Sequence, residues 1–198
     1  ADHRDFKRRI MDMNQELERL EERELSSKLI YDGKVVHLYV DSVSLPDGQT
    51  AVREYVKHIG AVAVLPLTEQ NEVICVRQYR YAHRCLLTEI PAGKLEWGEN
   101  HFECGKRELK EETGATAEKF IFLGKMYPSP GFLNEVIYMY AATGLSFGNQ
   151  NLDEDEFLTV EKIPLEKAVV MILSGEITDG KTQTAILKLK LLKDKNLL

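Results

Sequence analysis

Three carboxylates near the middle of the chain, Glu108, Glu111 and Glu112, have the residue type and the spacing that could do chemistry. On an α-helix, residues three and four apart lie on the same face, so Glu108 faces both of the others. Like charges at this spacing destabilise an isolated helix, and we expect no basic residue to compensate them on that face. Hard divalent cations prefer clustered carboxylate oxygens. The spacing therefore predicts a metal site on one face of a helix.

The helix that would carry these carboxylates is well marked. Asn100 can cap its first turn, and Glu103, three residues later, suits a capping-box pair. Gly114 follows the last turn, where a left-handed residue is needed. Proline and glycine between positions 91 and 98 predict a tight loop that brings backbone carbonyls near the carboxylates. Such a cluster beside a glycine loop predicts a magnesium site for phosphate chemistry, in which metal neutralises phosphate charge and activates water.

The segment that contains this loop and helix resembles the Nudix box, G-x5-E-x7-R-E-U-x-E-E-x-G-U, in which U is aliphatic or small. The box positions are matched by Gly93, Glu99, Arg107, Glu108, Leu109, Glu111, Glu112, Gly114 and Ala115. The resemblance implies that Arg107 and Glu99 form an ion pair that shapes the loop.

The same resemblance assigns a metal site. It implies that Glu108 and Glu112 coordinate the metal and that Glu111 supports or shares it. The backbone carbonyl of Ala92, just before the box, would be another ligand. The implied cofactor is Mg2+, with Mn2+ as the alternative.

Three further segments resemble the ADP-ribose pyrophosphatases within the Nudix family: EIPAGKLE at 89–96, VRQYR at 76–80 and SPGFLNE at 129–135. This resemblance covers residues 28–192 and implies Mg2+-dependent hydrolysis of the diphosphate linkage of ADP-ribose to AMP and ribose 5-phosphate. The residues that it implies in substrate binding are Arg53, Glu54, Arg80, Ser129, Gly131 and Glu135.

The general base lies outside the box in this resemblance. LDEDEF, residues 152–157, resembles the acidic loop that closes over substrate in that sub-family. Glu154 and Glu156 both fit, one as the base and the other as a metal ligand. With Glu111, they are the catalytic carboxylates that the sequence predicts.

Two alternatives to ADP-ribose hydrolysis stay open. The substrate could be another nucleotide sugar, such as GDP-mannose or ADP-glucose. A rival from a different class is a Nudix-fold sensor that binds ADP-ribose without cleaving it. The intact set of Glu108, Glu111 and Glu112 favours the enzyme, because binding alone does not need all three.

Composition limits the cellular setting. The 198 residues are 43% hydrophobic and 29% charged, with a net charge of −6, which fits one or two small domains with a real core. No apolar run approaches the ~18 residues of a membrane span. The three cysteines lack metal-ligand spacing and favour reduced thiols in the cytoplasm. An acidic chain without a basic stripe argues against nucleic acid as the principal partner.

The periodicity of the sequence divides it into three parts. Residues 1–26 are predicted to be a helical extension, either packed on its own domain or bound to a partner, with an apolar seam formed by Phe6, Ile10, Met13, Leu17 and Leu20. Residues 27–58 read as a small antiparallel sheet of three strands. By the resemblance this sheet forms a homodimer, in which each copy completes the neighbour's substrate site. Residues 59–198 are predicted to be the catalytic domain, a Nudix α/β/α sandwich with a mixed sheet.

One segment invites a different interpretation. Residues 175–182, GEITDGKT, match the phosphate-loop pattern G-x4-G-K-[ST]. Glu176 and Asp179 would place negative charge where phosphates must sit, and no βαβ unit surrounds the segment. We therefore interpret it as a turn between two helices predicted at Pro164–Ser174 and Thr182–Lys193, with glycine at the cap.

Overall fold

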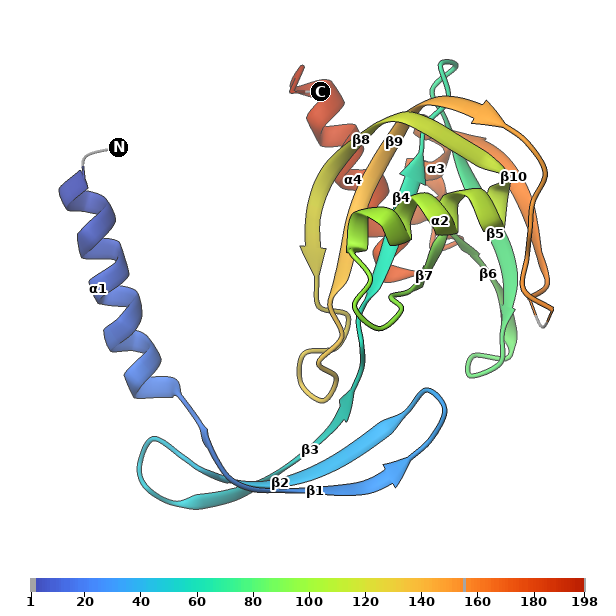
Figure 1. The fold of residues 1–198 in the computed structure, drawn as a ribbon. Coiled ribbons are helices and arrows are strands. Elements are labelled where there is room, and N and C mark those ends of the chain that lie inside the picture. Colours follow the sequence, from blue (N-terminus) through green and yellow to red (C-terminus); the bar gives the residue numbers. More distant parts are fainter. Residues whose placement is uncertain (1–2, 155, 198) are drawn as a thin grey trace. The chain divides into compact units, whose positions relative to one another are not determined.

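The computed structural model describes residues 3–154 and 156–197, with side chains from Asp12 onward. The chain divides into two compact units (Figure 1). One comprises the residues up to His58 together with Ser129–Asn134, and the other comprises Ile59–Pro128 with the chain from Glu135 onward. None of the helices in the described ranges is long and apolar enough to cross a membrane.

The first unit contains one helix and the predicted antiparallel sheet of three strands, which has the order β1-β2-β3. Its elements are α1 (His3–Leu20), β1 (Arg23–Asp32), β2 (His37–Ser44) and β3 (Thr50–Lys57). The first strand begins four residues before the boundary expected at Ser27. In the predicted seam, Phe6 and Ile10 lie outside the described side chains, whereas Met13, Leu17 and Leu20 are exposed.

The segment Ser129–Asn134 belongs to this first unit because it pairs with β3. The amide of Val56 donates to the carbonyl of Phe132 at 2.7 Å, and the amide of Asn134 donates to the carbonyl of Val56 at 3.2 Å. The sequence gives no local signal for this pairing, since the two segments are more than 70 positions apart.

The second unit consists of two sheets with helices on both sides. Its strands are β4 (Ala61–Pro66), β5 (Glu72–Arg80), β6 (Cys85–Glu89), β7 (Ala92–Lys94), β8 (Ala115–Met126), β9 (Ile137–Phe147) and β10 (Leu158–Pro164). Its helices are α2 (His101–Thr113), α3 (Leu165–Leu173) and α4 (Gly180–Asp194). One sheet has the order β10-β5-β6 and the other β7-β4-β9-β8. The second is mixed, because β4 and β9 run parallel while the other neighbours are antiparallel.

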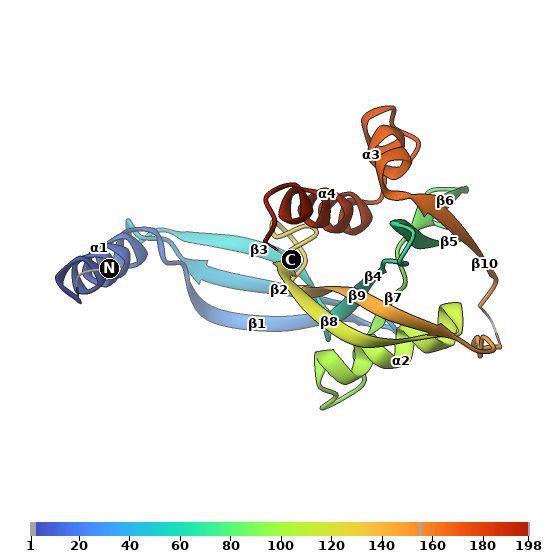
Figure 2. The same cartoon turned by 90° about the horizontal axis from the view of Figure 1, so that it is seen from above.

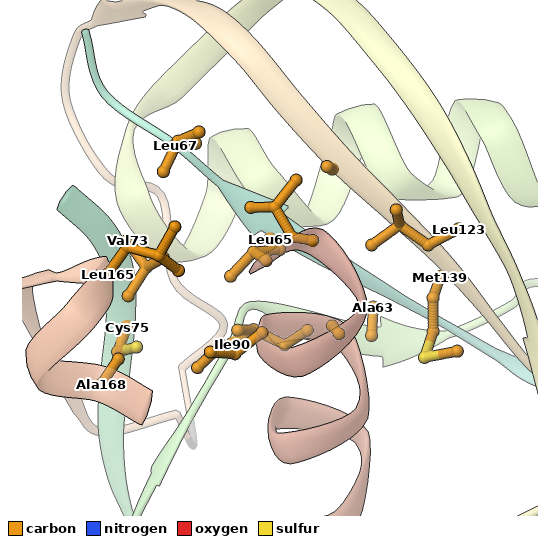
Figure 3. Close-up of a cluster of buried hydrophobic side chains, with 14 of the residues drawn as sticks. Ala63, Leu65, Leu67, Val73, Cys75, Ile90, Leu123, Met139, Leu165 and Ala168 are labelled. Carbon is orange, nitrogen blue, oxygen red and sulfur yellow. The ribbon is translucent and has the colours of Figure 1, made fainter. Parts of the chain in front are cut away.

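Strand β4 is buried on both faces, as its continuous apolar sequence predicts. Successive side chains of a strand point to opposite faces. Ala63 and Leu65 therefore enter the apolar cluster that α3 and α4 cover, shown in Figure 3. Val62 and Val64 enter a second cluster with Cys104 and other residues under α2. Figure 2 shows the resulting layers, with α2 on one side of β4 and β9 and α3 and α4 on the other.

The ends of α2 follow the sequence prediction closely. The Asn100 side chain accepts a hydrogen bond from the amide of Phe102 at 2.8 Å, and Gly114 has φ of 69°. Glu103, expected as the capping-box partner, instead contacts Lys106 at 3.0 Å. Residues Ala92–Lys94, predicted to be part of a loop, form the short strand β7 just before α2.

The cap at the end of α2 gives a prediction about stability. At Gly114 an added Cβ would meet the carbonyl oxygen of Gly148 at 2.4 Å, in addition to the left-handed backbone. At Gly175, φ is +80° but nothing lies within 4 Å of the same position. We expect Gly175→Ala to lower the free energy of unfolding by about 1–2 kcal/mol through backbone strain, and Gly114→Ala by a further ~1–3 kcal/mol through the clash. Chemical denaturation of both variants checks this, and equal losses would contradict it.

Candidate functional site

The carboxylates of α2 lie directly against the backbone of β7. At Gly93 an added Cβ would be 1.9 Å from Oε1 of Glu108, so the glycine hydrogen is what allows the carboxylate to approach. The amide of Ala92 donates to Oε2 of Glu112 at 3.2 Å. Strand β7 is itself fixed by pairing with the buried β4, where Ala92 faces Ala63. The core thus positions the short strand that contacts both carboxylates.

Arg107 joins three carboxylates of the box. Its Nε and Nη2 donate to the two oxygens of Glu99, each at 3.0 Å, and this confirms the predicted ion pair. Its Nη1 donates to Glu108 at 2.7 Å and to Glu111 at 3.0 Å. The guanidinium holds the pKa of Glu99 at about 2.

The expectation that no basic residue compensates the acidic face was therefore wrong. A guanidinium presents five N–H donors in a planar fork, so one arginine can serve the loop and the helix together. Glu108 and Glu111 are both turned to Arg107, while Glu112 has no cationic partner within hydrogen-bond distance among the described residues.

Glu112 is the most deeply buried acid of the helix, at 1% exposure. Burial raises the pKa of Glu112 to about 8, and repulsion from Glu156 and Glu108 adds to the shift. Burial also raises the pKa of Glu108, against the opposing effect of Arg107. Carboxyl groups are thus gathered where burial disfavours their charged form.

This donor set fits a divalent cation. The groups are hard oxygen ligands, and a bound cation would relieve repulsion that Arg107 relieves only in part. Within residues 3–154 and 156–197, no three acidic, histidine or cysteine side chains already form a metal-binding group. Glu108 and Glu111 would have to exchange contacts with Arg107 for contacts with the cation. The carbonyl of Ala92 stays a predicted ligand, whereas the amide of the same residue donates to Glu112.

The acidic loop after β9 is tied to the end of α2. The side-chain amide of Gln150 donates to the carbonyl of Glu112 at 2.5 Å, and the amide of Asn151 donates to the carbonyl of Glu111 at 3.0 Å. Beyond these anchors Glu154 is exposed, whereas Glu156 is half-buried. Asp155 lies outside the described residues.

Electrostatics places Glu156 with the helix carboxylates. Its charge contributes to the raised pKa of both Glu112 and Glu108. Burial raises the pKa of Glu156 itself; the backbone hydrogen bond with Asp153 opposes this shift, and the charges of Asp153 and Glu111 add to it. Glu156 also borders a cavity of about 480 Å³, lined in addition by Arg77, Leu86, Leu152, Phe157, Leu158 and Thr159.

Arg80, at the end of β5, is held by a glutamate that the sequence analysis missed. Its Nε and Nη2 donate to the carboxylate of Glu89 at 2.6 and 2.7 Å. Glu89 is 1% exposed. The available signal was a single acidic residue, two positions before Pro91, in a segment otherwise free of charge from Cys85 to Ile90. The hydrogen bond to Glu89 raises the pKa of Arg80, and the charges of Glu89, Asp179 and Glu112 add to the shift. The charge of Arg80 acts in turn on Glu156.

The other predicted substrate residues are divided between the two units. Arg53 pairs with Glu22 through Nε at 2.7 Å. Glu54, the next residue of β3, points to the opposite face of that sheet. Ser129 and Gly131 lie in the segment that pairs with β3, where the carbonyl of Ser129 closes a turn. Glu135 belongs to the second unit, just before β9.

Comparison with known proteins decides the family. A family model described as NUDIX domain matches residues 57–183. An ADP-ribose pyrophosphatase of Bacillus subtilis (strain 168) is 45% identical over 174 residues, covering 87% of this chain and 94% of that protein. The chain belongs to the Nudix family. A methanol dehydrogenase activator of Bacillus methanolicus is 44% identical over 173 residues, covering 86% of this chain and 94% of that protein.

The fold of this Nudix protein is also found among solved structures. The structure of an ADP compounds hydrolase matches it with a TM-score of 0.78 at 20% identity, covering 90% of this chain and 97% of that chain. This confirms the predicted α/β fold class with its mixed sheet.

The contact between β7 and α2 can be tested through metal binding. In Gly93→Ala the three atoms nearest the new Cβ all belong to the end of the flexible Glu108 side chain, which would be displaced. We expect the free energy of unfolding to change by less than about 1 kcal/mol. The rise in melting temperature that Mg2+ produces by binding the folded state should be lost. Differential scanning calorimetry with and without Mg2+ measures both quantities.

A matched control for this test is Gly180→Ala, because nothing lies within 4 Å of its added Cβ. It should keep the Mg2+ response of the wild type. A full Mg2+ response in Gly93→Ala would show that Glu108 does not need its position against β7.

Proposed function

We propose that this Nudix protein is a hydrolase that cleaves the diphosphate linkage of ADP-ribose to AMP and ribose 5-phosphate, with Mg2+ as its cofactor. The observation that carries the proposal is the placement, in one unit, of the buried carboxylate Glu112 and the half-buried carboxylate Glu108 with the half-buried cation Arg80. A diphosphate needs both positive charge around its oxygens and a place for a metal. The name and the near-complete coverage of the Bacillus subtilis relative support ADP-ribose as the substrate.

The metal ligands in this proposal are Glu108, Glu112 and Glu111, with the carbonyl of Ala92. When bound, the cation neutralises phosphate charge and lowers the pKa of water. The chain's part is to hold these oxygens in a buried region, where electrostatic interactions are stronger than in water. Arg80 would bind a non-bridging oxygen of the diphosphate through its guanidinium, which suits that anion.

Glu156 is the general base in this proposal, and Glu154 is not. Its carboxylate is half-buried and close enough to act electrostatically on Glu108 and Glu112, whereas Glu154 is exposed. Glu156 would accept the proton of the attacking water at a carboxylate oxygen. The loop anchors at Gln150 and Asn151 restrict where that carboxylate can lie.

The remaining sequence predictions stay part of the proposal. Arg53, Glu54, Ser129, Gly131 and Glu135 would contact the ADP-ribose. We also propose a cytoplasmic homodimer formed through residues 27–58. A three-stranded sheet needs a packing partner, and β1 is exposed along its whole length, with the apolar side chains Leu25, Leu29, Ile30 and Tyr31 at the surface. The cysteines are free thiols, as a reducing compartment favours.

The substrate is tested with a panel. The protein is incubated with Mg2+ and ADP-ribose, ADP-glucose, GDP-mannose, NADH or a nucleoside triphosphate, and the products are separated. We expect ADP-ribose to show the highest kcat/KM and to yield AMP, because a site that hydrogen-bonds the terminal ribose discriminates by up to ~10⁴ against analogues that leave its polar groups unpaired. Faster cleavage of GDP-mannose would reject the substrate, and binding of ADP-ribose without cleavage would favour a sensor.

The base is tested with two matched substitutions in the same loop. Glu156→Gln removes the proton acceptor and should lower kcat by ~10²–10⁴ with little change in KM. Glu154→Gln, at an exposed position, should keep kcat near that of the wild type. Steady-state kinetics with ADP-ribose distinguishes the two, and the reverse pattern would assign the base to Glu154.

A further inference from the structure

The segment that resembles a phosphate loop points its lysine into the protein. Lys181, in the first turn of α4, contacts the carboxylate of Glu89 and lies 3.0 Å from Asp179. Only 11% of its side chain is exposed. The lysine that a phosphate loop would offer to a nucleotide is therefore already engaged by two acids.

Glu89 joins this lysine to Arg80. Its Oε1 accepts from Nε of Arg80, and its Oε2 accepts from both Nη2 of Arg80 and Nζ of Lys181. A buried carboxylate is costly unless it is paired and hydrogen-bonded. Burial pushes the pKa of Glu89 upward, but the hydrogen bond from Arg80 and the charge of Lys181 together hold it below its usual value.

The start of α4 is connected to the same place by a second set of contacts. Asp179 caps the helix, accepting from the amide of Thr182 at 2.9 Å and from its hydroxyl at 2.5 Å. The hydroxyl of Thr182 in turn accepts from the amide of Ile90 at 2.8 Å. Thr182 is fully buried. Because Ile90 follows Glu89 directly, these bonds fix the position of Lys181 relative to that carboxylate.

We propose that Lys181 is a positioning residue for Arg80, acting through Glu89; this rests on the proposed function, in which Arg80 binds the substrate diphosphate. Two of the three guanidinium nitrogens of Arg80 are bound to Glu89, and Nη1 has no hydrogen bond to any described residue. Nη1 is therefore available to a ligand. Arg80 must bind the buried carboxylate of Glu89 and also face the substrate diphosphate. Lys181 therefore supplies a second positive charge to Glu89.

Without Lys181, the buried carboxylate of Glu89 would have Arg80 as its one cationic partner among the described residues. Arg80 is 40% exposed on its side chain, so solvent and substrate would compete with Glu89 for the same cation. The guanidinium would then be less fixed, and the net positive charge of Arg80 and Glu89 together with position 181 would be smaller. Loss of Lys181 should therefore weaken substrate binding more than the chemical step.

The first test compares Lys181→Met with Lys190→Met, a lysine of the same helix that pairs with Glu166 and Asp194 on another part of the surface. With ADP-ribose and Mg2+, we expect Lys181→Met to raise KM about tenfold while kcat stays within about twofold, as for an interaction made equally in ground and transition states. Lys181→Arg, which keeps the charge, should restore most of the affinity. Lys190→Met should behave as wild type. An unchanged KM in Lys181→Met, an equal rise in Lys190→Met, or a loss in kcat alone would overturn the proposal.

The second readout does not depend on activity. The Nε–H of Arg80 is identified by nuclear magnetic resonance from the signal missing in Arg80→Lys, and its hydrogen exchange is measured. We expect exchange at least about tenfold faster in Lys181→Met than in the wild type, and unchanged exchange would overturn the proposal. If the wild type does not cleave ADP-ribose, the proposed function fails while this measurement still decides the role of Lys181.

A third variant covers the case in which Lys181→Met does not fold. Glu89→Gln/Lys181→Met removes the buried charge together with its counter-charge, which is far less destabilising than leaving one of them alone. In this folded variant KM should remain raised, because Arg80 has lost its carboxylate anchor. A KM equal to that of the wild type would show that neither residue positions Arg80.

Discussion

The constraint on which the site depends is the gathering of buried and partly buried acids in the second unit. Burial, together with repulsion from Glu156 and Glu108, raises the pKa of Glu112, and repulsion from Glu156 adds to the effect of burial on Glu108. Arg107 offsets part of this repulsion by binding Glu99, Glu108 and Glu111 together. Glu112 is left with one backbone amide. Apolar packing must supply the rest, and Leu109 and Cys104 of the same helix are fully buried against β4 and β9.

Strand β4 connects this packing to both sides of the site. Its alternating side chains hold α2 on one face and α4 on the other. Helix α2 carries the carboxylates. Helix α4 carries Lys181, which contacts Glu89, and Thr182, which contacts Ile90. The residues from Glu89 to Gly93 therefore receive contacts from both helices. A change in the core under either helix would move the same five-residue segment, which is why we expect core and site to be coupled.

The sequence predicted what depends on local spacing. The Asn100 and Gly114 caps of α2 and the buried β4 follow from residues close to one another along the chain, and the structure confirms each. It did not predict the pairing of Val56 with Phe132 or the contact of Lys181 with Glu89, which is 92 positions away. The Arg107–Glu99 pair, which the structure also confirms, came from the resemblance to the Nudix box. The resemblance implied a pair between Arg107 and Glu99 only, and it did not predict that the same guanidinium also binds Glu108 and Glu111. The dimer and the separate substrate roles stay predictions.

Residues 175–182 match the phosphate-loop pattern, but their surroundings in the fold exclude phosphate binding there. A helix start binds an anion when its amides are unpaired and no negative side chain stands before them. Here Asp179 occupies that position and takes the amide of Thr182 for itself. The hydroxyl that would face a metal is instead bound to the backbone of Ile90, and the lysine is bound to Glu89. Lys181 and Thr182, which could bind a phosphate at the start of α4, instead bind Glu89 and Ile90. They thereby fix the segment beside Arg80, where we expect the substrate phosphate to bind.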